Sequence, residues 1–172
     1  MSSPKQELAV SPKHSTLFNN QVANALKRYD DIKSALVDAD TMAAKNAAKK
    51  FGTLIDSIKF DELNKDARVA DTLKKAVTEL KANAEAMVEE NDLTEIRQDF
   101  RMISENLFPF LRSIQYEGPK LYWQNCPMAF GEGKDANWIS NTKEIFNPYL
   151  GKHHPEYKGT MLHCGIVNDS IQ

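Results

Sequence analysis

The sequence has only two cysteines, no long apolar run and no excess of charge of one sign. No uninterrupted apolar stretch approaches the roughly 20 residues of a membrane-spanning helix, so we expect no transmembrane segment. The net charge of −2, with both signs interspersed, leaves no basic stripe for a phosphate backbone and argues against nucleic acid as a partner. The first sixteen residues are polar, contain two prolines and lack the apolar segment of a secretory signal. We therefore expect residues 1–16 to form a flexible leader.

Sequence motifs of the common enzyme classes are also missing. The chain has no HExxH helix, no glycine-rich phosphate loop, no GxSxG elbow and no dinucleotide-binding fingerprint. Its two cysteines do not form the CxxC pair of a thiol oxidoreductase. We expect a protein that is not an enzyme and has no organic cofactor.

Glycine and proline are scarce between residues 17 and 115, where each occurs once among many alanine, leucine, lysine and glutamate residues. These are strong helix formers, and four segments show apolar residues at steps of three and four. The four apolar stripes are Phe18, Val22, Leu26, Tyr29, Ile32 and Leu36; Met42, Ala44, Ala47, Ala48, Phe51, Leu54, Ile55 and Ile58; Val69, Leu73, Ala76, Val77, Leu80, Ala84 and Met87; and Leu93, Ile96, Phe100, Ile103, Leu107, Phe110 and Ile114. Short connections predict an all-α fold, an antiparallel up-down four-helix bundle.

Local signals place the ends of these helices. Ser15 or Thr16 can cap the first helix, the second begins near Asp40, and Asp92 with Glu95 forms a capping box before the fourth. Pro109 predicts a kink or a break near Leu107, because proline removes one helical hydrogen bond.

After residue 115 the composition changes, since six of the seven glycines and eight of the fifteen aromatic residues follow this point. The change predicts an irregular, aromatic-rich C-terminal tail, residues 116–172, packed on the bundle as part of one domain spanning 17–172. Loops, turns and short strands are expected there. The segment DANWISNTKEIF predicts one short helix, entered through Ser140 or Asn141 with Glu144 at the far end of a capping box.

Two short clusters in the tail hold soft ligands. Pro127 favours an extended Cys126, so Cys126 and Met128, two residues apart, can face one ion together. Met161 and Cys164 are three residues apart and can meet on a single helical turn. A thiolate with a thioether favours Cu(I), and by extension Ag(I), whereas Zn(II) is the weaker candidate because thioethers are poor zinc ligands.

Other interpretations of these residues remain open. His163 next to the second cysteine is an optional ligand that would favour Zn(II) or Cu(II). A disulfide between Cys126 and Cys164 would instead stabilise the tail by roughly 3 kcal/mol. The methionines can also be core residues, as we expect of Met42 and Met87 in the helices. For His153 and His154 we expect a solvated turn.

The tail also resembles a known family in the order of its motifs. The stretches YWQNCPMAFGEGKDANWIS, EIFNPYLG and MLHCG are similar to the signature of an uncharacterised family of bacterial periplasmic domains. That family occurs as exported proteins with a signal peptide, and as the C-terminal domain of membrane-fusion proteins in copper/silver-type heavy-metal efflux systems.

The resemblance implies a set of functional positions and a cellular context. The matching metal-binding positions are Cys126, Met128, Met161 and Cys164, and the matching positions that shape the tail are Trp138, Asn147, Pro148, Tyr149 and Gly151. We expect an exported Cu(I)- or Ag(I)-binding protein of the periplasm or cell envelope, with an efflux membrane-fusion protein as its partner. The alternative is a structural or protein-interaction domain closed by a disulfide.

Overall fold

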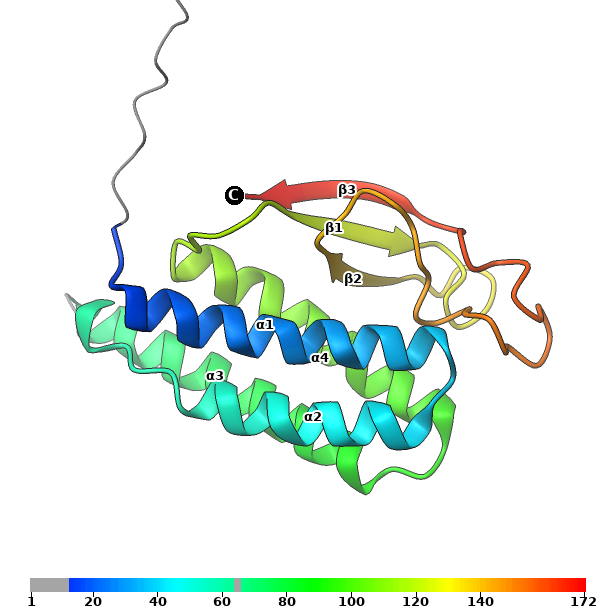
Figure 1. Cartoon of the computed structure of the whole chain (residues 1–172), viewed down its shortest axis with the longest axis horizontal. Helices are drawn as coiled ribbons and strands as arrows, with labels where there is room; N and C mark the ends of the chain where they lie inside the picture. Colours follow the sequence, from blue (N-terminus) through cyan, green and yellow to red (C-terminus); the bar gives the residue numbers. More distant parts are fainter. Residues whose placement is uncertain (1–12, 64–65) are drawn as a thin grey trace, which may run out of the picture.

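The computed structural model describes residues 13–63 and 66–172, which form four α-helices, a short 3-10 helix and a three-stranded antiparallel sheet (Figure 1). The helices are α1 (Thr16–Val37), α2 (Thr41–Asp56), α3 (Ala67–Glu89) and α4 (Leu93–Ser113), with the 3-10 helix at Asp61–Leu63. The strands are β1 (Leu121–Cys126), β2 (Ala136–Ser140) and β3 (Ile166–Ile171).

Polar side chains begin all four helices. The side chains of Ser15, Asp40 and Asp66 each accept a backbone N–H from the first turn of α1, α2 and α3. Asp92 accepts the N–H groups of Thr94 and Glu95 at 2.9 and 3.1 Å. These bonds satisfy donors that have no partner inside the helix, which confirms the predicted starts at Ser15, Asp40 and Asp92.

Most of the expected leader, residues 1–16, lies outside the described residues. Its last part is ordered against the helices, because Ser15 caps α1 and the Nε2 atom of His14 lies 3.1 Å from the carbonyl oxygen of Gln115. The ring of His14 also packs on Phe18, with 4.9 Å between centroids.

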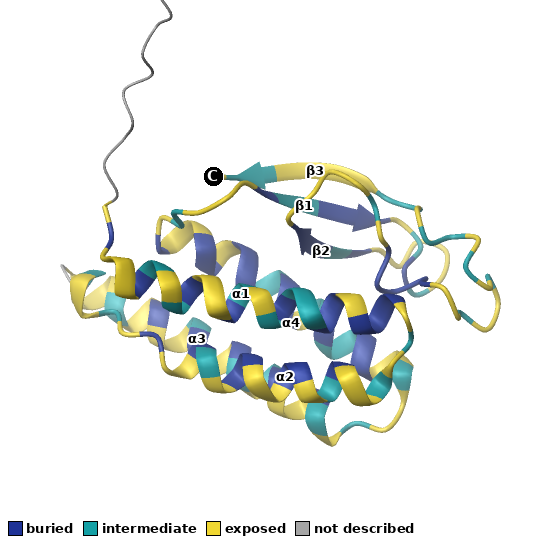
Figure 2. Ribbon diagram, viewed as in Figure 1, coloured by how far each residue is buried: buried dark blue, intermediate teal, exposed yellow. Residues whose placement is uncertain are grey.

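Most residues of the four apolar stripes form the core, as Figure 2 shows by the buried faces that the helices turn toward one another, but Val69 in the first turn of α3 is exposed. Each helix packs mainly against the next one along the chain, while the antiparallel up-down course of the bundle stays a prediction. Met87 is fully buried, as expected. Met42 is not a core residue, since 74% of it is exposed. It lies two positions from buried Ala44, a rotation of about 200° around the helix, and so on the outer face.

Pro109 lies inside α4 and does not break it. The helix continues to Ser113, whose hydroxyl donates to the carbonyl oxygen of Pro109 at 2.9 Å. Phe108 and Phe110, on either side of the proline, are both buried. Their packing keeps the segment helical although proline removes one backbone bond.

The tail contains a small three-stranded sheet joined by long turns and loops, so the expected short strands are confirmed while the all-α class is wrong for residues 116–172. The strand order is β2-β1-β3, with Cys126 paired to Ala136 and Asn125 to Ile166. The predicted short helix is absent within this described segment, since residues 136–140 pair with β1 and the residues after Ser140 form bends rather than a helix. The Nε2 atom of Gln124 then donates to the carbonyls of residues 142–144, which fixes the chain after β2 as a loop.

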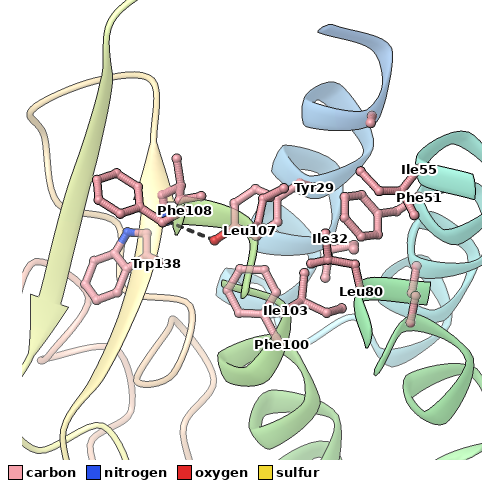
Figure 3. Packing of buried hydrophobic residues seen from close by; sticks show 14 of the residues in the cluster. Tyr29, Ile32, Phe51, Ile55, Leu80, Phe100, Ile103, Leu107, Phe108 and Trp138 are labelled. Atoms are coloured by element: carbon pink, nitrogen blue, oxygen red, sulfur yellow. Dashed lines mark hydrogen bonds between the residues drawn. The ribbon is translucent and has the colours of Figure 1, made fainter. Parts of the chain in front are cut away.

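The sheet covers the side of the bundle formed by α1 and α4 (Figure 1). The hydroxyl of Tyr29 on α1 joins three elements, because it lies 2.7 Å from the hydroxyl of Ser104 on α4 and accepts the backbone N–H of Ile139 on β2 at 2.9 Å. Figure 3 shows Tyr29 between the helical core and the sheet. Trp123 on β1 also stacks on Phe108, with 4.5 Å between ring centroids.

Replacing Tyr29 by Phe tests this junction. Tyr29→Phe keeps the ring but leaves the buried N–H of Ile139 without its acceptor, and we expect the free energy of unfolding to fall by about 1–3 kcal/mol in urea titrations. Tyr122→Phe, at a half-buried tyrosine of β1, is the control and should change stability much less. Equal effects of the two substitutions would contradict the role of the Tyr29 hydroxyl.

Candidate functional site

The two cysteines meet at one end of the sheet. Cys126 is the last residue of β1, and Cys164 lies two positions before β3. Since Asn125 pairs with Ile166, the antiparallel register continues to place Cys126 opposite Gly165, beside Cys164. Both thiols are free, and the Cys164 thiol is close enough to raise the pKa of Cys126.

Gly165 makes this close approach possible. Its backbone has a φ of 154°, and a Cβ atom there would lie 2.9 Å from the carbonyl oxygen of Asn125 and 3.0 Å from the Trp138 ring. Any other residue would push the Cys164 segment away from β1.

Each cysteine has a methionine two or three residues away in the chain. The backbone turns directly after Cys126, so Cys126 and Met128 do not continue one extended run as expected, but the turn brings the N–H of Met128 back to the Cys126 sulfur. In the other cluster, the N–H of Cys164 donates to the carbonyl of Met161 at 3.0 Å, which forms the expected single turn. Both methionines are partly buried and pack against the core.

Burial is the main influence on the pKa of Cys126. Its side chain is completely buried, and this loss of solvent raises the pKa of the thiol above its ordinary value. Hydrogen bonds from the Met128 N–H and the Asn147 side chain act in the opposite direction, because they stabilise the thiolate. The Cys126 sulfur is therefore a neutral thiol near neutral pH, with donors already placed to support a thiolate.

Asn147 connects the Cys164 segment to the rest of the tail. Its Nδ2 atom donates to the Cys164 carbonyl at 2.8 Å, and its backbone N–H donates to Leu162 at 2.7 Å. Its Oδ1 atom accepts the N–H groups of Tyr149 and Leu150, both at 2.9 Å. Fully buried and bonded on both sides, Asn147 fixes the backbone that positions the second cysteine.

The residues after Asn147 attach this loop to the bundle. Arg97 on α4 donates from Nε to the Pro148 carbonyl at 3.0 Å and from Nη2 to the Leu36 carbonyl at 3.1 Å. A Cβ atom on Gly151 would lie 2.3 Å from the carbonyl oxygen of Val37, so only glycine fits against the end of α1.

Aromatic packing completes the support of the site. The hydroxyl of Tyr149 donates to the Asn137 carbonyl at 2.6 Å, and its ring packs against Trp138 and Phe130 with centroids 6.0 and 5.3 Å away. Trp138 is fully buried on β2. Trp138, Asn147, Pro148, Tyr149 and Gly151 therefore all shape the segment around the cysteines.

The histidines of the tail do not gather around one site. His163 is exposed, with its Nδ1 atom 2.8 Å from the Ile145 carbonyl and its ring against Phe146. In His154, Nδ1 accepts the N–H groups of Glu156 and Tyr157 and so fixes a turn, while His153 is exposed. Over residues 13–63 and 66–172, no three His, Cys, Asp or Glu side chains gather as a metal site, so an ion at the cysteines would depend on the methionine sulfurs.

Sequence analysis does not identify two residues that hold the tail in place. Arg97 follows Ile96 on α4 and is buried beneath the loop at 147–151, where it donates to the Pro148 carbonyl. Gln124 is a polar residue in the middle of a strand, and its role depends on carbonyls about twenty positions further along the chain. Neither carries a local signal for these contacts.

Comparisons with known proteins identify one family. Residues 25–117 match the family model described as "Protein of unknown function (DUF3347)". The match covers most of α1, all of α2, α3 and α4, and ends before β1, so the cysteine segments lie outside it. No curated protein and no solved structure matches the chain. Among the described residues, no helix has the length and apolarity needed to span a bilayer.

Replacing Asn147 should loosen the site. Asn147→Ala removes the acceptor for two buried N–H groups, and we expect a loss of at least ~2 kcal/mol in urea unfolding together with faster alkylation of Cys126 by iodoacetamide. Asn141→Ala, at an exposed asparagine of the same tail, is the control and should alter neither quantity. Unchanged stability and thiol reactivity in Asn147→Ala would refute this assignment.

The pH dependence of stability should reveal the buried thiol. Because the folded pKa of Cys126 is raised above that of an unfolded thiol, about 8.5, its contribution is complete below that value and is lost as pH rises through the folded pKa. Urea unfolding between about pH 7 and 10 should therefore show a steeper loss for the wild type than for Cys126→Ala. Parallel curves would mean that the thiol has the same pKa in both states.

Proposed function

The chain belongs to the DUF3347 family of proteins of unknown function, and we propose that it is an exported protein of the periplasm or cell envelope that binds Cu(I) or Ag(I). Cys126 and Cys164 are the thiolate ligands of the proposal, and Met128 and Met161 are the thioether ligands. His163 is an optional ligand. The bound ion is cargo, and its recipient in the proposal is a membrane-fusion protein of a heavy-metal efflux system.

The observation that carries the proposal is the meeting of the two free thiols. The strand register and Gly165 bring Cys126 and Cys164 together from distant parts of the chain, and each arrives with a methionine two or three positions away. A structural core needs no such pairing of thiol and thioether in both segments.

The chemistry of these donors fits a soft monovalent ion. Thiolates and thioethers prefer Cu(I) and Ag(I). With only two thiolates, Zn(II) would need imidazole or carboxylate groups to complete its four ligands, and these do not gather here within the described residues. The Met128 N–H and the Asn147 side chain already donate to the Cys126 sulfur, and such donors hold a ligating thiolate in position. Because the thiol is neutral when free, binding releases its proton.

Metal titration of freshly reduced protein tests the proposal. Native mass spectrometry with one equivalent of Cu(I), Ag(I) or Zn(II) should show one retained soft ion, and competition with a Cu(I) chelator should give its affinity. The double variant Cys126→Ser/Cys164→Ser should lose the ion. Met128→Leu and Met161→Leu should each weaken binding by about tenfold, whereas Met102→Leu, at an exposed methionine of α4, should not. An unchanged affinity in the double cysteine variant would refute the site.

A structural role for the same residues is the second candidate, favoured by the same closeness of the thiols. A Cys126–Cys164 disulfide would close the tail and leave function to a protein-contact surface. Free-thiol counting on protein purified without reductant, with thermal unfolding before and after reduction, separates the two. Oxidised thiols, a large loss of stability on reduction and no recovery with Cu(I) would favour the disulfide.

A further inference from the structure

A pocket that none of the proposed metal ligands lines contains a buried cation. It has a volume of about 400 Å³, within the range of small-molecule sites, and lies between the first turns of α4, the turn after β1 and residues 149–157. Arg97 lines this pocket although only 5% of the residue is exposed.

The charge of Arg97 has no counterion among the described residues. Its Nε and Nη2 atoms donate to backbone carbonyls, which leaves Nη1 as the nitrogen without a hydrogen bond in the described part of the chain. Burial lowers its pKa to about 10, and no neighbouring carboxylate offsets this effect. A buried cation held only by neutral groups carries a desolvation cost that an anion in the pocket would reduce.

The remaining lining sets the charge of a suitable anion. Lys134 and Glu156 contribute one charge of each sign, and His154 is neutral near pH 7 because burial and the nearby charge of Arg97 lower its pKa. The pocket therefore has an excess of one positive charge, that of Arg97, which suits a monoanion better than a dianion such as a phosphate ester.

The aromatic rings in the lining indicate that the rest of a suitable ligand is apolar. Phe130, Tyr149 and Tyr157 line the same pocket and provide apolar walls around the charged groups. We propose that this pocket binds a small organic carboxylate, with the carboxylate at Nη1 of Arg97 and an apolar body against the aromatic side chains. The proposal is independent of metal binding at the cysteines.

Benzoate is the test ligand, and benzamide is its uncharged counterpart of the same shape. Titrations of the full chain, labelled with ¹⁵N and kept free of metal, should give saturable shifts of the Gly131 and Tyr157 amide signals with benzoate. We expect at least about tenfold weaker binding of benzamide, because it lacks the charge.

Charge variants at the rim make the test specific without disturbing the fold. Lys134→Gln should weaken benzoate binding by about three- to tenfold, and Glu156→Gln should strengthen it by a similar factor. Lys143→Gln removes a lysine that is also exposed but lies outside the pocket lining, and it should have no effect. Arg97→Met should abolish binding, but Arg97 also holds two carbonyls, so the rim variants decide if this variant does not fold.

Saturable benzoate binding with opposite effects of Lys134→Gln and Glu156→Gln supports the carboxylate site. Absence of saturable shifts at millimolar benzoate, equal binding of benzamide, or the same affinity in Lys134→Gln and Lys143→Gln would each overturn it. Preferential binding of inorganic phosphate at a pH above its second pKa would also overturn the proposal, since phosphate is then mostly a dianion.

Discussion

The buried amide of Asn147 is the interaction on which the geometry of the C-terminal half depends. One of its atoms holds the Cys164 carbonyl and another accepts two N–H groups of its own loop, so the loop and the second cysteine are held together. That loop is attached to the helices through Arg97 and through the close contact of Gly151 with the end of α1. The helical bundle therefore serves as a rigid support for a site that it does not itself contain. Because each of these contacts depends on the next, a substitution at any of these residues should alter the positions of the cysteines.

The helices could be predicted because their information is local. Capping side chains and the apolar period of 3.6 residues depend on neighbours within one or two turns, and Ser15, Asp40 and Asp92 perform as their sequence indicates. The position and pairing of the expected strands could not be predicted in the same way, because β1 and β2 are buried or half-buried on both faces and show no alternation. The Asn141–Glu144 spacing imitates a capping box, yet pairing with β1 and the bonds from Gln124 determine the backbone there. Tertiary contacts thus override a weak local preference.

The candidate site was likewise predictable only in part. The clustering of sulfur residues in two short segments predicted that the segments belong together, and the structure brings Cys126 and Cys164 side by side. What the sequence could not supply is the support around them. Arg97 occupies a helical position that would face solvent if the loop after Asn147 were not packed over it. Its burial follows from an arrangement of the whole chain, so no pattern on α4 alone can indicate it.

Burial of Cys126 has two opposite effects under the proposed function. It raises the pKa of the thiol, so the empty site near neutral pH holds a proton that a metal ion must displace. It also removes water from the ion, and in a medium of low polarity the attraction between a thiolate and a cation is stronger. The two donors to the sulfur shift this balance toward the metal-bound form, because they stabilise the thiolate without themselves carrying charge. In this proposal, binding is coupled to proton release, and acidification favours loss of the ion from a site whose backbone is held by Asn147.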